Sequence, residues 1–334
     1  EVIHWFVNRY LPSVAGLYGN FSFTNRFSGQ PYGDFLLGLP TQVTRLDPFA
    51  VQKNRWTDVS FFAQDDWKLS SKLTVSYGLR YEYNQPSYTQ DNNVYSFDRA
   101  TGSVVIPDDN ARSLFSPFFP TNVPIVSATR LGLDRSLRQS DKNNWAPRLG
   151  LSYLLTPKTV IRAGIGIYYG HFSGLVPAYL AGGPFSLNTT SNNVIANGQA
   201  QFTFERPFAA AGVSGTLNLN GVEPNLRNTY STQYSFTVER ELAQNLAIRA
   251  SYIGSKGTNL PYQRNVNQPF ASTTPFAQAR RPYPLYNNVV VAENGANSLY
   301  SGLQVEVSKR FAKGLLVQSA WTWAKSLSEV DDTG

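Results

Sequence analysis

The sequence contains no cysteine and no methionine, and its only histidines are His4 and His171. Without cysteine there can be no disulfide, no thiolate nucleophile and no Cys-ligated zinc or iron–sulfur site. Neither histidine has a recognisable triad or metal partner nearby in the sequence, so histidine-based sites are nearly excluded too. Charged residues are also scarce, at 15% against about 25% in ordinary soluble domains. This composition is unlike that of a typical cytosolic enzyme.

The chain also lacks a segment that could cross a membrane as a helix. The longest stretch without charge, residues 163–204, is long enough to span a bilayer, but glycines and prolines interrupt it repeatedly. There is no signal-peptide pattern after Glu1 and no initiator methionine. We therefore expect the chain to be an excised piece of a longer protein.

Clusters of basic residues are missing as well, although the net charge is +7. Lysines and arginines are scattered singly, and the densest group is only Arg280 and Arg281. Nucleic-acid binding usually needs a basic patch or stripe. A nucleic-acid partner is therefore not expected.

Long segments alternate strictly between apolar and polar residues. In residues 73–83, every odd position is apolar or aromatic and every even position is small, polar or charged. This period of two predicts β-strands with one dry and one wet face. The same pattern recurs in residues 159–169, 230–238, 246–252, 303–307 and 315–323.

The predicted strands come in pairs joined by short turns and separated by long polar segments. The turns are expected at residues 69–72, 156–158, 241–245 and 309–314, and the long connections at 84–144, 170–228 and 254–297. Earlier strands are expected at residues 17–27 and 2–9. The result is a four-fold repeat of strand, short turn, strand and long loop, with about ten strands in all and no linker between domains.

This pattern predicts an all-β fold, an antiparallel transmembrane β-barrel. Such barrels have strands of about 9 to 11 residues, short turns on one side, long loops on the other, and alternating apolar-out and polar-in residues. Strands of soluble sandwiches are usually about half as long. Aromatic residues near the predicted strand ends, such as Trp67, Tyr81, Trp145 and Tyr169, are typical of the girdles at the membrane surfaces.

Charged residues recur on the polar phase of these strands. Because a charge that faces lipid is costly, we predict that they face a hydrated lumen. They either contact a ligand directly or only solvate the wall and pair with their neighbours. The candidates are Arg80, Glu82, Arg162, Glu239, Arg249 and Glu306. In the same way, Tyr77 is expected to face lipid and Ser76 the lumen.

Other local patterns suggest catalysis only superficially. The Gly164–Gly166 segment lies in a predicted strand and does not open a helix, so it is not a dinucleotide-binding motif. Asp65 and Asp66 are adjacent in a strand and point to opposite faces, so they cannot act as an acid and base pair. Residues 108–110 could touch Ca²⁺ but are better explained as a solvated turn. No catalytic residue, cofactor site or metal site is predicted, and the chain is not expected to be an enzyme.

Several segments resemble TonB-dependent outer-membrane receptors. Residues 60–83, SFFAQDDWKLSSKLTVSYGLRYEY, resemble the barrel of that family. Residues 33–40 (GDFLLGLP), 144–150 (NWAPRLG) and 250–257 (ASYIGSKG) resemble its Oar-like branch, whose members carry a carboxypeptidase-regulatory-like domain ahead of a plug. The resemblance spans nearly the entire chain and implies that residues 1–334 are part of a barrel of 22 strands, the number in plugged transporters. The TonB box, the plug and the regulatory-like domain are not seen in this sequence.

The resemblance implies energy-coupled uptake of an unidentified ligand across the outer membrane of a Gram-negative bacterium. The implied partners are outer-membrane lipid, lipopolysaccharide and, through the missing N-terminal parts, the TonB complex. Two alternatives stay open: a passive porin or surface adhesin with the same barrel, and a secreted all-β glycan-binding module or hydrolase. Finding a plug upstream would separate the receptor from the porin, and solubility without detergent would indicate the secreted protein.

Overall fold

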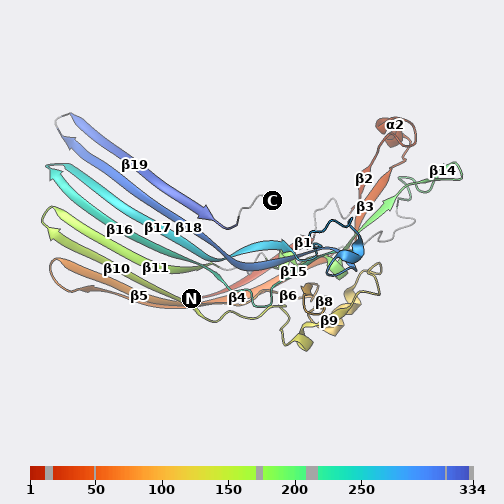
Figure 1. The fold of residues 1–334 in the computed structure, drawn as a ribbon, viewed down its shortest axis with the longest axis horizontal. Helices are drawn as coiled ribbons and strands as arrows, with labels where there is room; N and C mark the ends of the chain where they lie inside the picture. The colour runs from red at the N-terminus through yellow and green to blue at the C-terminus, as the bar shows by residue number, and fades with distance from the viewer. Residues whose placement is uncertain (12–17, 49, 171–175, 208–216, 313, 331–334) are drawn as a thin grey trace.

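The computed structural model describes residues 1–11, 18–48, 50–170, 176–207, 217–312 and 314–330 (Figure 1). Its main feature is a curved sheet of long antiparallel strands, with a layer of shorter elements at one end and an arm beyond that layer. The long strands, in order across the sheet, are β1 (Val2–Leu11), β4 (Ala50–Lys68), β5 (Leu73–Asn84), β10 (Asn144–Thr156), β11 (Thr159–Gly170), β16 (Thr229–Ala243), β17 (Leu246–Asn265), β18 (Tyr286–Ala312) and β19 (Leu315–Ser328).

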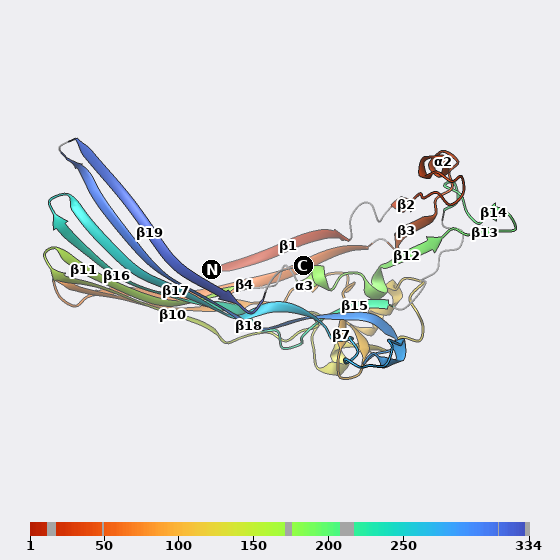
Figure 2. The same cartoon turned by 45° about the horizontal axis from the view of Figure 1, so that its top comes forward.

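Four hairpins build this sheet. The short turns predicted from the sequence join β4 to β5, β10 to β11, β16 to β17 and β18 to β19, and each pair is antiparallel. β1 pairs with β4 and β19 with β18, so these two strands form the margins of the long-stranded sheet (Figure 2). No pairing between β1 and β19 closes the sheet within the described residues. The fold is that of an open segment of an antiparallel β-barrel wall.

The strand predicted at residues 2–9 is confirmed by β1, but the one predicted at residues 17–27 is wrong. Of that segment the structure forms only a short strand, β2 (Asn20–Ser22), in a separate sheet, and Leu17 lies outside the described residues. The local alternation favoured a long strand here. The strand is short because pairing with β3 extends over only three residues of the described segment.

The strand register carries the alternation coherently from strand to strand. Tyr81 lies opposite Phe61 on one side and Trp145 on the other, and Tyr169 lies opposite Tyr230. The rings of Tyr81 and Trp145 are 4.7 Å apart, and those of Tyr169 and Tyr230 are 5.6 Å apart. These side chains form an aromatic row across the end of the strands nearest the loops, on the apolar face of the sheet. This is the placement expected of a membrane-interface girdle.

The long polar connections fold into a compact layer instead of remaining irregular. The layer has its own buried clusters, one around Tyr95, Phe185 and Tyr286, the other around Leu137 and Leu180. Its elements are β6 (Tyr88–Thr89), β7 (Ser96–Asp98), β8 (Ser103–Ile106), β9 (Ile125–Ser127), β15 (Leu217–Val222), α3 (Val176–Tyr179) and the 3-10 turns Asp109–Leu114, Ala128–Leu131, Gly183–Phe185 and Gln278–Arg280. We call this part the loop layer.

The last predicted loop is shorter than the sequence suggests. β17 continues to Asn265 and β18 begins at Tyr286, so both strands run well beyond the segment predicted to be strand. The additional residues pair with each other and with the parallel strand β15 in the loop layer. Their alternation is interrupted by register shifts between Gly257 and Pro261, which explains why the sequence pattern did not reveal them.

An arm extends beyond the loop layer, at the end of the molecule farthest from the hairpin turns (Figure 1). Asp34 is fully buried there, and its carboxylate accepts hydrogen bonds from the backbone N–H groups of Phe27 and Ser28. This carboxylate holds the turn that presents α2. The elements of the arm are β2, α2 (Pro31–Leu36), β3 (Gln42–Asp47), β12 (Leu187–Asn192), β13 (Ile195–Ala196) and β14 (Gln199–Ala200).

Candidate functional site: the polar face of the sheet

All six charged residues singled out in the sequence lie on one face of the main sheet. The strand register shows this. Arg80 lies opposite Ala146 of β10, and Ser152, which is on the same face of β10 as Ala146, lies opposite Arg162. Arg249 lies opposite Glu239 on one side and Glu306 on the other. Tyr77 and Ser76 are on opposite faces, as every pair of adjacent strand residues must be. We call the surface with Arg80 and Glu306 the polar face; that it borders a lumen stays a prediction.

Four of the six residues form a continuous ion-pair ladder across β11, β16, β17 and β18. Arg162 donates from Nη1 to Glu239 Oε2 at 3.0 Å, and Arg249 donates from Nη2 to the same oxygen at 3.2 Å. Arg249 also donates from Nη1 to Glu306 Oε2 at 3.2 Å. The two positive and two negative charges cancel within the ladder. It lies near the hairpin turns, where β16 and β17 meet.

Arg80 and Glu82 form a separate pair toward the loop layer. Arg80 Nε donates to Glu82 Oε1 at 2.6 Å, and its Nη2 donates to Ser60 Oγ at 2.7 Å. Glu1 Oε2 lies 3.4 Å from the same Nη2. The six predicted residues therefore form two self-neutralised groups and do not converge on one point. This arrangement agrees with the simpler of the two roles left open by the sequence, a wall whose charges pair with neighbours.

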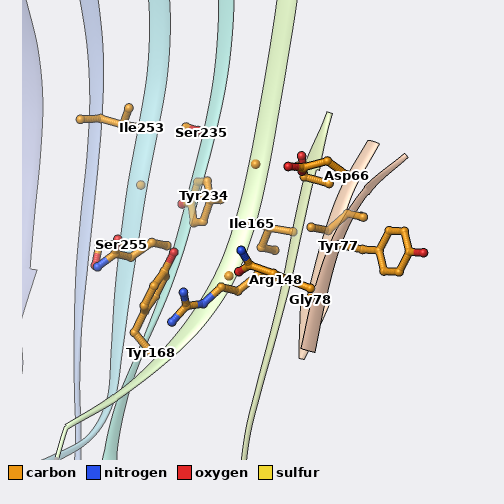
Figure 3. A pocket seen from close by; sticks show the side chains of 18 of the residues that line it. Asp66, Tyr77, Gly78, Arg148, Ile165, Tyr168, Tyr234, Ser235, Ile253 and Ser255 are labelled. Atoms are coloured by element: carbon orange, nitrogen blue, oxygen red, sulfur yellow. The ribbon is translucent and has the colours of Figure 1, made fainter. Parts of the chain in front are cut away.

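A hollow of about 590 Å³ opens between these two groups (Figure 3). Its floor is made of small residues in adjacent strands: Gly78 and Gly166 flank Arg148, and Gly150 lies opposite Gly164. Because glycine has no side chain, the backbone is bare here and the wall is thin. Tyr77 points away from this hollow, toward the apolar face, while Arg148 and Tyr168 lie on its side of the sheet (Figure 3).

Arg148 and Tyr168 are the residues that the sequence prediction missed. The guanidinium of Arg148 lies over the ring of Tyr168, with its carbon 4.5 Å from the ring centre. Arg148 shares the polar phase of β10 with Gly150 and Ser152, so extending the alternation to residues 144–156 would have identified it. No signal of that kind exists for the Arg148–Tyr168 contact, because it depends on the register of two strands.

One further charged cluster ties the loop layer together. Glu293 is almost fully buried and accepts hydrogen bonds from Arg264 Nη2 and Arg99 Nη1, both at 2.7 Å. The hydrogen bond from Arg264 is the main reason that the pKa of Glu293 is held below its ordinary value, although burial acts in the opposite direction. Arg99 comes from the first long connection, and Arg264 and Glu293 come from the last. Their ion pairs therefore join two segments that are distant in sequence.

The motifs that resembled catalytic sites have structural explanations. Asp108 caps a 3-10 turn: Oδ1 accepts from the N–H of Ala111 at 3.0 Å, and Oδ2 accepts from Asn92 Nδ2 at 2.6 Å. Asp65 lies opposite Tyr77 on the apolar face and accepts a hydrogen bond from its hydroxyl at 3.2 Å. His4 contacts Thr57, whereas His171 lies outside the described residues.

Two kinds of feature are absent from the described part of the chain. No group of three or more acidic, histidine or cysteine side chains is close enough to hold a metal ion. No described helix combines the length and apolar character needed to cross a membrane.

Comparison with known proteins identifies the family. The model of the family described as "Outer membrane beta barrel domain" matches residues 1–334. The siderophore receptor PirA from Pseudomonas aeruginosa is 13% identical, with a TM-score of 0.40, and the match covers 86% of this chain and 40% of that one. The alcaligin outer-membrane receptor FauA from Bordetella pertussis is 11% identical, with a TM-score of 0.38 and coverage of 98% and 39%. The comparison with curated proteins finds no match.

The chain thus spans about two fifths of the length of these two solved receptors. The family match covers the whole chain, and it agrees with the open wall of long antiparallel strands, the apolar face and the aromatic row. This chain belongs to the outer membrane β-barrel domain family, and its place is the outer membrane of a Gram-negative bacterium.

Proposed function

We propose that the chain is part of the barrel of a TonB-dependent receptor that takes up a ligand through a plugged lumen. The observation that carries the proposal is the polar face, which continues through neighbouring strands from β5 to β19, with register shifts only near the hairpin turns and beyond Gly257 in the described strands. A charged face that extends along every strand is stable in a membrane only where water or protein covers it. A lumen supplies that cover.

The open sheet supports a barrel larger than this chain. β1 and β19 each have a long edge that no described strand covers, and lipid cannot satisfy the N–H and C=O groups of such an edge. Strands from elsewhere in the parent protein would pair with them. On the resemblance to the Oar-like branch, we propose that a plug and a carboxypeptidase-regulatory-like domain belong to the same parent protein. We propose no catalytic activity for the chain, since the charged residues described on the polar face pair with one another.

The loop layer is the outward side in this proposal. Its connections are long, whereas the opposite ends of the strands are joined by short turns, as in outer-membrane barrels generally. Scattered lysines and arginines on this side can meet the phosphates of lipopolysaccharide.

The test uses the full-length protein in its own outer membrane. The protein should fractionate with outer membranes, require detergent for extraction, and form a crosslink to TonB through its N-terminal region in energised cells. A matched control is the same protein in cells without TonB. Recovery in the soluble periplasmic fraction would overturn the barrel assignment. A membrane-bound protein with no plug and no TonB crosslink would instead be a passive porin.

A further inference from the structure

Arg148 is an arginine of the polar face that has no carboxylate partner among the described residues. Arg80, Arg162 and Arg249 each lie within 3.4 Å of a glutamate oxygen. Arg148 makes no hydrogen bond or ion pair with any residue of the described chain, and its guanidinium is held only by stacking over Tyr168. Stacking on a ring face leaves the N–H edge of a guanidinium free to bind an anion.

The floor beside this guanidinium is kept open by glycine. A Cβ atom at Gly166 would lie 3.2 Å from Arg148 Cγ and 3.2 Å from the ring of Tyr168. Any larger side chain at this position would therefore press on the stacked pair and intrude into the hollow. Gly78 occupies the equivalent position on the other side of Arg148.

Neutral hydrogen-bonding groups continue the same row across the next strands. Gln233 lies opposite Gly166, Ser255 opposite Gln233, and Tyr300 opposite Ser255. The side chains of Gln233 and Tyr300 form no hydrogen bond with another described residue, while Ser255 shares one with Ser231. Neighbouring strands are about 4.8 Å apart and the first step from Arg148 is the bare Gly166, so Gln233 stands roughly 10 Å from Arg148 across the sheet and Tyr300 roughly 19 Å.

We propose that this hollow binds a small hydroxylated carboxylate, such as a sugar acid. Arg148 takes the carboxylate through charge-assisted hydrogen bonds, which are about twice as strong as neutral ones. The amide of Gln233, two strands from Arg148 across the bare Gly166, takes a hydroxyl group farther along the ligand. The inference rests on the proposed function to the extent that solute must reach the polar face through a lumen. The same carboxylate chemistry could come from an aspartate or glutamate of a protein segment inside the barrel, and the experiment separates the two sources.

The experiment measures binding of gluconate to the purified full-length protein in detergent, by saturation-transfer NMR. Sorbitol is the matched probe, because it has the same hydroxylated chain with an alcohol in place of the carboxylate. Wild-type protein should bind gluconate and not sorbitol. Arg148→Gln should weaken binding by at least about tenfold, and Arg148→Lys should retain part of it because the charge remains. Gly166→Val should also abolish binding, since its side chain crowds the Arg148–Tyr168 pair at the floor of the hollow and leaves the charge in place.

Arg162→Gln is the control variant, because it removes a guanidinium of the same face that is already paired in the ladder. It should bind gluconate as the wild type does. Heat-modifiable migration of every variant on gels shows that the barrel has folded. Equal binding of gluconate and sorbitol, or wild-type affinity in Arg148→Gln, would overturn the proposal.

If an aspartate or glutamate of a protein segment inside the barrel binds Arg148 instead, the results should differ. Folded wild-type protein would not bind gluconate, and Arg148→Gln would lower its unfolding temperature because an internal ion pair is lost. That outcome also overturns the solute proposal. Binding at equilibrium in detergent needs no TonB or proton gradient, so a failure of energy-coupled transport would not be mistaken for a failure of this site.

Discussion

Gly254 shows how a single residue constrains this wall. It lies opposite Tyr234 on the apolar face, and a Cβ atom at Gly254 would overlap the ring of Tyr234. The glycine therefore provides the space in which the tyrosine ring lies across the neighbouring strand. Within β18, Tyr300 similarly lies over the position of Gly302, two residues along the same strand on the polar face. Rings that cover glycines fill gaps in the sheet surface.

Replacing Gly254 with alanine should consequently destabilise the barrel. We expect a loss of about 1 to 3 kcal/mol, the usual range for overpacking, because the ring of Tyr234 must leave its position. Urea unfolding of the refolded full-length protein measures the loss. Gly164→Ala is the control, since the nearest atom to its Cβ position is Ser235 Oγ at 3.6 Å, an ordinary contact. If the two variants are equally stable, the tyrosine does not depend on the glycine.

Glu293 is a second residue whose effect can be measured separately, in the loop layer. Because the pKa of Glu293 is lowered, its ion pairs stabilise the loop layer at pH values above 4.5, the ordinary pKa of a glutamate. This stability is lost as the pH falls through the lowered pKa. Hydrogen exchange of the backbone amides near Tyr286 and Val291, corrected for the intrinsic rate, should therefore speed up on acidification below pH 4.5.

At neutral pH, Glu293→Gln should lower the free energy of local opening by about 1.5 to 3 kcal/mol, because two arginines lose a charged acceptor. Glu223→Gln is the control: its carboxylate is more exposed and its contact with Arg99 is longer, at 3.5 Å, so its loss should matter little. Equal exchange rates in the two variants would show that Glu293 does not hold the layer together.

At the scale of the element, the two faces of a strand should respond oppositely to the same charge. β16 provides the cleanest comparison, because Phe236 and Ser235 are adjacent near its centre. Phe236 lies opposite Ala163 and Tyr252, so an arginine there would find no carboxylate directly across either neighbouring strand. At position 77 the result would be harder to interpret, because Asp65 lies opposite and could pair with the new charge.

Phe236→Arg should therefore prevent or weaken assembly, at a cost of about 2 to 4 kcal/mol near the bilayer midplane. Ser235→Arg should leave folding nearly intact, since its side chain joins the polar face beside Gly164. The amount of heat-modifiable protein in outer membranes gives the comparison. The reverse result would mean that the polar face meets lipid, and the lumen interpretation of Arg162 and Glu239 would fail with it.

At the scale of the whole molecule, the open margins determine what this chain can do alone. Unpaired edges are templates for association with other strands. Expressed without the rest of its protein, the chain should aggregate and should not produce a protease-resistant, heat-modifiable monomer. The full-length protein, refolded under the same conditions, is the control. A stable monomer of residues 1–334 in detergent would show that β1 and β19 can close on each other.

The features that could be predicted correctly from the sequence are those that depend on near neighbours in the chain. Alternation assigns each residue a face from its own position and the residues two away, so the hairpins, the phase of Arg80 and Glu306 and the separation of Asp65 from Asp66 could all be predicted. The same local rule failed at residues 17–27, where the alternation had no long partner strand to pair with.

The contacts across strands and the fold of the long connections depend on tertiary structure and could not be predicted from local patterns. The register that links Arg162, Glu239 and Arg249, and the stacking of Arg148 on Tyr168, depend on hydrogen bonding between strands distant in sequence. The loop layer likewise depends on Arg99 reaching Glu293 across 194 positions of the chain. Such contacts leave no periodic signal, because their energy depends on the packing of whole segments and not on the order of residues within one.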